Sequence, residues 1–218
     1  MEEIIRSILD LEWAMMGRME NAGNSEEERP VFDAMRRAQF SAWPEEVAAS
    51  YLADLRRAEA DGRNLQDEKF TRMLKNIAPE EYGANLSRLP AVPAETETLV
   101  AEIWGMLKKL NEAFNEKYPV LGLSGRPLSA EDERDIPSIE TYQCSELLTY
   151  SPQTLALFKA FLERDMAAGN NLVEQVQRNT VIPMGFASLE DAEKELALMA
   201  LAEMGGQTCT SCGMEPIL

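Results

Sequence analysis

The sequence contains no histidine. Ser-His-Asp and Cys-His catalysis, His-ligated zinc hydrolysis and the Glu-x-x-His motif of di-iron helical bundles all depend on an imidazole group. These chemistries are therefore excluded. Any catalysis by this chain is left to carboxylates, arginines, amides and tyrosines.

Basic residues are also scarce, with 21 lysines and arginines against 38 aspartates and glutamates, which gives a net charge of −17. Nucleic acids and anionic membrane surfaces both require a basic face on the protein that binds them. We therefore expect neither nucleic acid nor membrane among the partners of this chain.

Long apolar runs are absent, and no stretch approaches the roughly 18 apolar residues of a membrane-spanning helix. The first residues carry acid at Glu2 and Glu3, where a secretory signal peptide carries base. The apolar stretch that follows is interrupted by Arg6, Asp10 and Glu12. These features predict a cytoplasmic protein.

Cysteine is limited to three residues, an odd number that does not form a secreted disulfide framework. Cys209 and Cys212 form a Cys-x-x-Cys pair near the C-terminus, whereas Cys144 is distant in sequence. Tetrahedral zinc requires four ligands, which a dimer with two from each chain would supply, and a redox pair would lack its usual βαβ setting. We expect a flexible tail over residues 206–218, with Cys209 and Cys212 as the candidates for a metal site, and no motif identifies a cofactor.

Helical periodicity runs through nearly every long segment, and no convincing alternating strand appears. In residues 2–20, Ile4, Ile8, Leu11 and Met15 recur at a spacing of three to four. Gly62 is placed to end a helix that begins after Pro44, and Asn64 to cap the next one. The sequence predicts a single all-α domain over residues 1–205.

Two parts of this domain look alike. Residues 30–43 match residues 137–150 in pattern at an offset of 107, and a proline-started helix follows each segment. Gly62 and Asn64 reappear as Gly169 and Asn171 at the same offset. The pattern predicts a helical bundle of two related helical-hairpin halves with a pseudo-twofold internal repeat, residues 1–85 and 96–204, joined by a connector over 86–95. The simpler alternative is that two unrelated helical hairpins carry the same sequence signals for beginning and ending a helix.

Polar side chains lie on helix faces that should be apolar. At 100° per residue, Glu12 falls beside the apolar stripe of the first helix, and Arg36 and Gln39 lie on the apolar face of the second. Gln143 and Glu146 occupy the corresponding face of the repeated helix. Burying such groups is costly unless they are paired, so the sequence predicts that they meet in the interior.

Two interpretations of this cluster are open. In the structural one, Arg36 bonds to Glu146 or Glu12 and fixes how the halves dock. In the functional one, the same groups line a small pocket, where a glutamate with a raised pKa acts as general acid or base. The roles would be acid/base catalysis for Glu12 and Glu146, anion binding for Arg36, ligand orientation for Gln39 and Gln143, and packing against the ligand for Trp43, Tyr142 and Tyr150.

Two hypotheses of function follow. The leading one is a protein that binds a small anionic or polar molecule between its two halves, with carboxylate acid/base catalysis as an extension of that role. The alternative is a non-enzymatic interaction or scaffolding protein, with a homodimer as one form of it, whose buried polar network is purely structural.

Several short motifs occur in a characteristic order. They include Asp10-Leu11-Glu12-Trp13, the segment from Met35 to Phe40 followed by Trp43, and Gly62-Arg63-Asn64-Leu65 with Glu68-Lys69-Phe70. Later come Gly125-Arg126-Pro127, Glu140-Thr141-Tyr142 and the segment from Glu146 to Ser151. In this order the motifs resemble a bacterial family known as domain of unknown function 4125, over about residues 5–190. The resemblance implies no activity, cofactor or partner.

Overall fold

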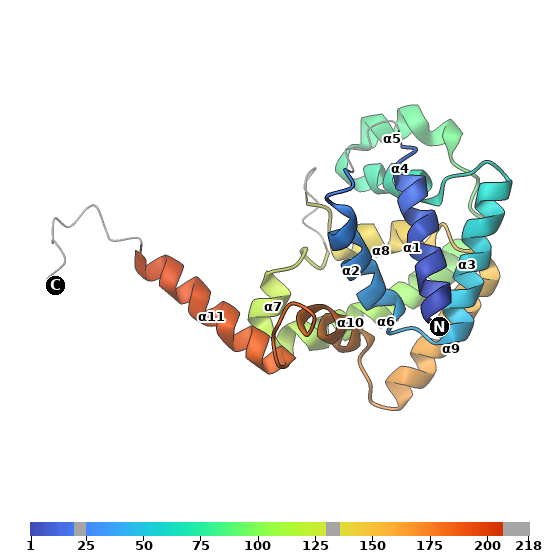
Figure 1. Cartoon of the computed structure of the whole chain (residues 1–218). Coiled ribbons are helices and arrows are strands. Elements are labelled where there is room, and N and C mark those ends of the chain that lie inside the picture. The colour runs from blue at the N-terminus through green and yellow to red at the C-terminus, as the bar shows by residue number, and fades with distance from the viewer. Residues whose placement is uncertain (20–24, 130–135, 207–218) are drawn as a thin grey trace, which may run out of the picture.

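The computed structural model describes residues 1–19, 25–129 and 136–206, and within these ranges the chain forms helices and no strands (Figure 1). The all-α prediction is therefore confirmed. The predicted tail, with Cys209 and Cys212, lies outside the described residues except for Gly206. The elements are α1 (Glu2–Met16), α2 (Arg29–Phe40), α3 (Glu45–Ala60), α4 (Leu65–Ile77), α5 (Pro79–Asn85), the 3₁₀ helix η1 (Leu86–Arg88), α6 (Ala94–Lys117), α7 (Pro119–Leu123), α8 (Ile139–Leu147), α9 (Pro152–Ala167), α10 (Leu172–Val181) and α11 (Leu189–Gly206).

The junction between α3 and α4 forms as its residue types predict. Gly62 follows the end of α3 with φ of 70°, a left-handed conformation that glycine adopts without a steric penalty. The side chain of Asn64 then accepts hydrogen bonds of 3.1 Å from the backbone N–H groups of Gln66 and Asp67. The first turn of α4 therefore has a side-chain cap.

The junction between α9 and α10 has the same local structure. Gly169 has φ of 79°, and Asn171 caps α10 by accepting from the backbone N–H groups of Val173 and Glu174. Both α3 and α9 have 16 residues. The side-chain amide of each capping asparagine also donates to a main-chain carbonyl, that of Met15 in α1 or Leu110 in α6.

Two short features complete the outline of the fold. Helix α2 ends at Phe40, and Pro44 precedes the first residue of α3. A short helix, α7, follows α6 directly after Tyr118. Its backbone N–H groups at Val120 and Leu121 each donate to the Glu193 carboxylate over 2.8 Å, so a contact from α11 supports it.

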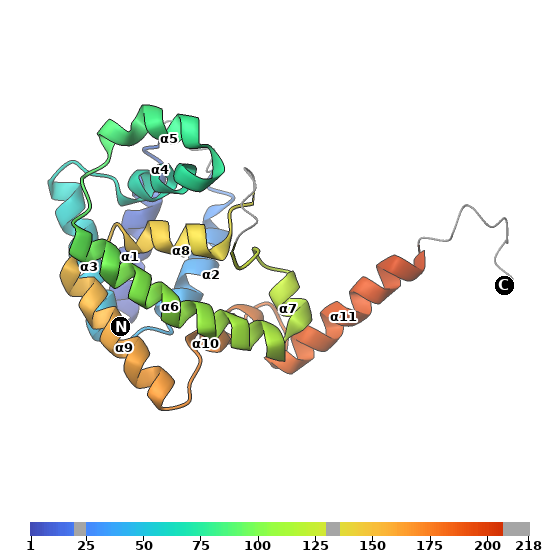
Figure 2. The same cartoon turned by 180° about the vertical axis from the view of Figure 1, so that it is seen from behind.

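The helices pack in two sets. Helix α1 contacts α2, α3 and α4, whereas α6 contacts α8, α9 and α10. Among the described residues, the main contacts between the sets are those of α2 with α10, α4 with α8, and α3 with α9. Helix α11 contacts α7 and α10 at its start and then extends away from the other helices (Figures 1 and 2). Among the described residues, no helix has both the length and the apolar character needed to cross a membrane.

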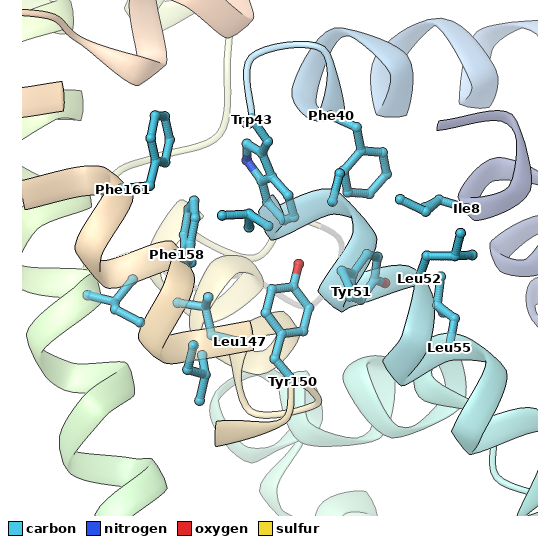
Figure 3. Close-up of a cluster of buried hydrophobic side chains, with 14 of the residues drawn as sticks. Ile8, Phe40, Trp43, Tyr51, Leu52, Leu55, Leu147, Tyr150, Phe158 and Phe161 are labelled. Carbon is cyan, nitrogen blue, oxygen red and sulfur yellow. The ribbon is translucent and has the colours of Figure 1, made fainter. Parts of the chain in front are cut away.

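An aromatic cluster joins the two sets at the centre of the core (Figure 3). The ring centroids of Tyr51 and Tyr150 are 4.6 Å apart, and those of Trp43 and Phe158 are 4.9 Å apart. Phe40 packs against Tyr51 at 5.6 Å. Since all of these rings are buried, the cluster contributes substantially to the stability of the core and fixes the region where the buried polar side chains meet.

Candidate functional site

The buried polar network begins with an ion pair between α1 and α2. Arg36 donates from Nε to Oε2 of Glu12 over 2.8 Å and from Nη2 to Oε1 over 2.5 Å. This is the bidentate geometry that suits a guanidinium and a carboxylate. Glu12 is completely buried, and the Tyr51 hydroxyl donates a further hydrogen bond of 2.7 Å to it.

Arg36 makes a second ion pair with Glu146 of α8. Nη2 donates to Oε1 over 3.0 Å, and Nη1 donates to Oε2 over 3.3 Å. The Tyr150 hydroxyl donates to Oε1 of the same carboxylate over 2.8 Å. Gln39 accepts from Nη1 of Arg36 over 2.7 Å and lies 3.5 Å from Glu146 through its amide nitrogen. A single guanidinium therefore joins α1, α2 and α8.

Lys69 of α4 completes the network. Its Nζ lies 2.5 Å from Oε2 of Glu146 and 3.6 Å from the centre of the Tyr142 ring. The Lys69 residue is only 2% exposed. With Arg36 and Lys69 opposite Glu12 and Glu146, the network holds two positive and two negative charges, which is the balance that buried charges require.

Arg36 has no N–H group left for a ligand. A guanidinium has five N–H donors, and those of Arg36 go to Glu12 twice, to Glu146 twice and to Gln39 once. An anionic ligand would reach Arg36 only by displacing one of these acceptors. The contacts fit the structural interpretation of Arg36 better than direct anion binding.

The charges around Glu146 also determine its protonation. Burial by itself raises the pKa of Glu146, but the charges of Arg36 and Lys69 and their hydrogen bonds outweigh it, so the pKa lies well below its usual range. Glu146 is therefore a carboxylate at neutral pH. Burial and the Glu146 charge together raise the pKa of Tyr150 well above its usual value, so this hydroxyl remains a donor.

A cavity of about 360 Å³ adjoins the network between α2, α6, α8 and α10. Exposed Met35 and Arg126 border it, so it opens to the surface. Seven of the eight residues expected at the site line this cavity, namely Arg36, Gln39, Trp43, Tyr142, Gln143, Glu146 and Tyr150. Glu12 does not line it and is connected to it through its hydrogen bonds with Arg36.

Gln143 has an unsatisfied polar atom beside the cavity. Its side-chain oxygen is buried and has no hydrogen-bond partner. A buried amide oxygen without a donor is costly, so a donor at this position would stabilise the protein. At the rim, Arg126 uses Nη1 to donate to the Pro137 carbonyl over 3.2 Å, and its guanidinium carbon lies 5.2 Å from the centre of the Tyr142 ring.

Sequence reasoning did not assign Lys69, Tyr51 or Arg126 to the site. Lys69 lies four residues after Leu65 and four before Met73, both buried, so helical spacing alone would have placed it on the inner face of α4. Tyr51 has the same relationship to Val47 and Leu55 in α3. No comparable signal exists for Arg126, which lies in the loop before α8.

The described part of the chain contains no group of three or more cysteine, aspartate or glutamate side chains arranged to hold a metal ion. Cys144 is half-buried in α8, away from the cavity lining. Cys209 and Cys212, the metal candidates, lie outside the described residues.

A family model described as protein of unknown function (DUF4125) matches residues 2–194. This is the family suggested by the order of the sequence motifs. No curated protein and no solved structure matches the chain.

Proposed function

The chain belongs to this family of proteins of unknown function, and we propose from the cavity that it binds a small, largely apolar molecule that carries a hydrogen-bond donor and an anionic group. The observation that carries the proposal is the cavity itself, with an unpartnered buried oxygen on Gln143 in its wall. Its volume of about 360 Å³ is within the range of small-molecule sites.

The walls suit an apolar ligand body. Leu107 from α6, Phe158 from α9 and Val176 from α10 line the cavity together with the rings of Trp43 and Tyr142. Aromatic and aliphatic walls favour ligands that bury apolar surface, and the few polar groups among them set the orientation. A ligand N–H or O–H directed at Gln143 would supply the donor that its oxygen lacks.

Among the described residues, Arg126 is the best-placed cation for an anionic ligand group. It borders the cavity and is exposed, and of its hydrogen bonds within the described part of the chain, the one to the Pro137 carbonyl uses Nη1. Arg36, by contrast, already donates all of its N–H groups. We therefore move the anion-binding role from Arg36 to Arg126 and propose that Arg36 holds the cavity wall in place.

The network argues against acid/base catalysis by Glu146. A general acid or base works best with a pKa near the operating pH, whereas the pKa of Glu146 is held far below it. The carboxylate also accepts hydrogen bonds from Lys69, Tyr150 and Arg36. We propose a binding protein rather than an enzyme that transfers protons through this residue.

We also propose that the two helix sets are related halves about a pseudo-twofold axis. The matching caps at Asn64 and Asn171, and the reciprocal contacts of α2 with α10 and α4 with α8, support this relationship. At the offset of 107, Lys69 corresponds to Val176. The Lys69 side chain is buried in its half, whereas the shorter Val176 side chain borders the cavity in the other half. This difference in side-chain length supports a cavity beside α10.

A cavity-filling variant tests the proposed function. Purified protein would be analysed by native mass spectrometry for bound metabolites and by thermal shift against small carboxylic acids that carry an amide or hydroxyl on an apolar body. We expect some of these compounds to raise the melting temperature of the native sequence. The same compounds should leave the melting temperature of Val176→Phe unchanged. Val31→Phe is the matched control, because Val31 is 64% exposed and outside the cavity.

Two outcomes would count against ligand binding at this cavity. One is that no compound shifts the native sequence and no metabolite is found. The other is that Val176→Phe, verified as folded by circular dichroism, responds to every compound as Val31→Phe does. Either would favour the competing hypothesis of an interaction or scaffolding protein with a purely structural network.

A further inference from the structure

A second cavity, of about 270 Å³, lies on another part of the molecule. It is bounded by the C-terminal half of α3, by α4, by the connector over residues 90–93 and by the turn between α8 and α9. Of the residues that the structure describes, Tyr150 is the one that borders both cavities. Three arginines line the second one: Arg57, Arg63 and Arg72.

Arg72 is buried without enough acceptors. The residue is only 9% exposed, and its Nη2 donates to the Pro90 carbonyl over 3.1 Å. Its Nε is buried and has no hydrogen-bond partner. Burial first, and then the charge of Arg63, lower the pKa of Arg72, whereas Glu68 and Tyr82 act in the opposite direction. The guanidinium therefore lies near the Arg63–Glu68 ion pair, buried and with its Nε–H group unpaired.

The other two arginines have donor groups to spare. Arg63 donates from Nε and Nη2 to the two oxygens of Glu68, each over 2.8 Å, and these bonds leave Nη1 for another acceptor. Arg57 has a 62% exposed side chain and lies 3.8 Å from Asp54, which is too far for a hydrogen bond.

Carboxylates balance these charges only in part, because Glu68 pairs with Arg63 whereas no carboxylate of the described residues is hydrogen-bonded to Arg57 or Arg72. Among the described residues, Asp54 is the one acidic residue of the lining. Its Oδ2 accepts from the backbone N–H of Ser151 over 2.9 Å and from the Thr154 hydroxyl over 2.6 Å, which leaves Oδ1 facing Arg57 at 3.8 Å. With Glu68 counted, three arginines face two carboxylates around this cavity, which is a local excess of positive charge in a chain with a net charge of −17.

We infer that this second cavity binds a small molecule through an oxyanion group, a phosphate or a carboxylate, held by Arg72, Arg63 and Arg57. Guanidinium groups bind both oxyanions with paired, charge-assisted hydrogen bonds. The Pro90 and Leu148 side chains leave room beside the arginines for an apolar portion of the ligand. This site is independent of the one proposed between α2, α6, α8 and α10.

Titration calorimetry tests the inference with two probes, inorganic phosphate and malonate, at an ionic strength held constant with sodium chloride. We expect one-to-one binding of at least one probe, and the tighter of the two identifies the oxyanion as phosphate or carboxylate. Arg57→Gln should weaken binding about tenfold, because it removes one charged contact. Arg56→Gln is the matched control, since Arg56 is the adjacent exposed arginine of α3 and lies outside the cavity lining.

Arg72→Gln should weaken binding more than Arg57→Gln does, provided that circular dichroism shows a native helix content. If Arg72→Gln does not fold, the comparison of Arg57→Gln with Arg56→Gln still decides the matter, because both residues are exposed. The inference is overturned if neither probe binds the native sequence. It is also overturned if Arg56→Gln and Arg57→Gln weaken binding equally, since that result would indicate general attraction to positive charge.

Discussion

The Lys69 ammonium lies 2.5 Å from the Glu146 carboxylate, although the two residues are 77 positions apart. Both side chains are almost completely buried, so water screens this ion pair much less than a surface pair. The contact ties α4 to α8 and brings the network to electrical balance. It should therefore affect the stability of the whole fold.

Lys69→Met tests this contact. The variant keeps most of the side-chain volume but leaves a surplus negative charge in the core, and breaking a buried pair in this way typically costs about 3–5 kcal/mol. Chemical denaturation would measure the free energy of unfolding. Lys117→Met is the control, because the Lys117–Glu174 pair is partly exposed and should contribute less than about 1 kcal/mol.

The double variant Lys69→Met/Glu146→Gln provides a second check on the same contact. It removes one charge of each sign, so its loss of stability should be smaller than the sum of the two single losses by about 1–3 kcal/mol. Additive losses would mean that Lys69 and Glu146 do not interact as the structure shows.

Acid should destabilise the protein in part through Glu146. Because the pKa of Glu146 is lower in the folded state than in the unfolded chain, its ionisation stabilises the fold fully above the ordinary glutamate pKa of about 4.5. That contribution is lost progressively as the pH falls below this value, toward the depressed folded-state pKa. The free energy of unfolding in urea, measured from pH 7 to pH 3, should therefore fall less steeply in Glu146→Gln than in the native sequence.

Glu174→Gln is the control for the acid experiment, since Glu174 pairs with partly exposed Lys117. It should keep nearly the full acid dependence of the native sequence. If Glu146→Gln and Glu174→Gln show the same slope, Glu146 is not the depressed carboxylate that its surroundings indicate.

The polar network shows which features of the site helical periodicity can predict and which it cannot. The 100° rule placed Arg36, Gln39, Gln143 and Glu146 on inward faces, and these side chains do line one cavity. Periodicity identifies the inner face of a helix but not the helix that the face meets. It could not therefore show that Lys69 of α4 contacts Glu146, or that Arg36 donates all of its N–H groups to Glu12, Glu146 and Gln39.

Helix boundaries were predictable where a local cause sets them. Gly62 and Asn64 act within a few residues, so the end of α3 and the start of α4 could be predicted from sequence. The short helix α7 could not, because Glu193, 72 residues beyond Leu121, holds its first N–H groups. The family membership of the chain was also apparent from motif order.

Gly62 provides a backbone test of the α3–α4 junction. With φ of 70°, a Cβ at this position is strained although the space around it is open, so Gly62→Ala should destabilise the protein by about 1 kcal/mol. Gly105 is the opposite case, a glycine inside α6 with nothing within 4 Å of a Cβ. Gly105→Ala should therefore stabilise it by roughly 0.5–1 kcal/mol. Thermal unfolding of both variants should show melting temperatures that move in opposite directions, and a shared direction would contradict the assigned conformations.

Cys144 should react slowly with thiol reagents in the folded protein. Burial, with a smaller contribution from the Glu140 charge, raises the pKa of this thiol to about 12. The thiolate is the reactive form, so at pH 8 the folded protein should react at least about 100-fold more slowly than the chain unfolded in urea. The measurement uses a Cys209→Ser/Cys212→Ser background, in which Cys144 is the one remaining thiol. Glu140→Gln should speed the reaction only modestly because burial dominates the shift, and equal rates in folded and unfolded protein would show that Cys144 is not protected.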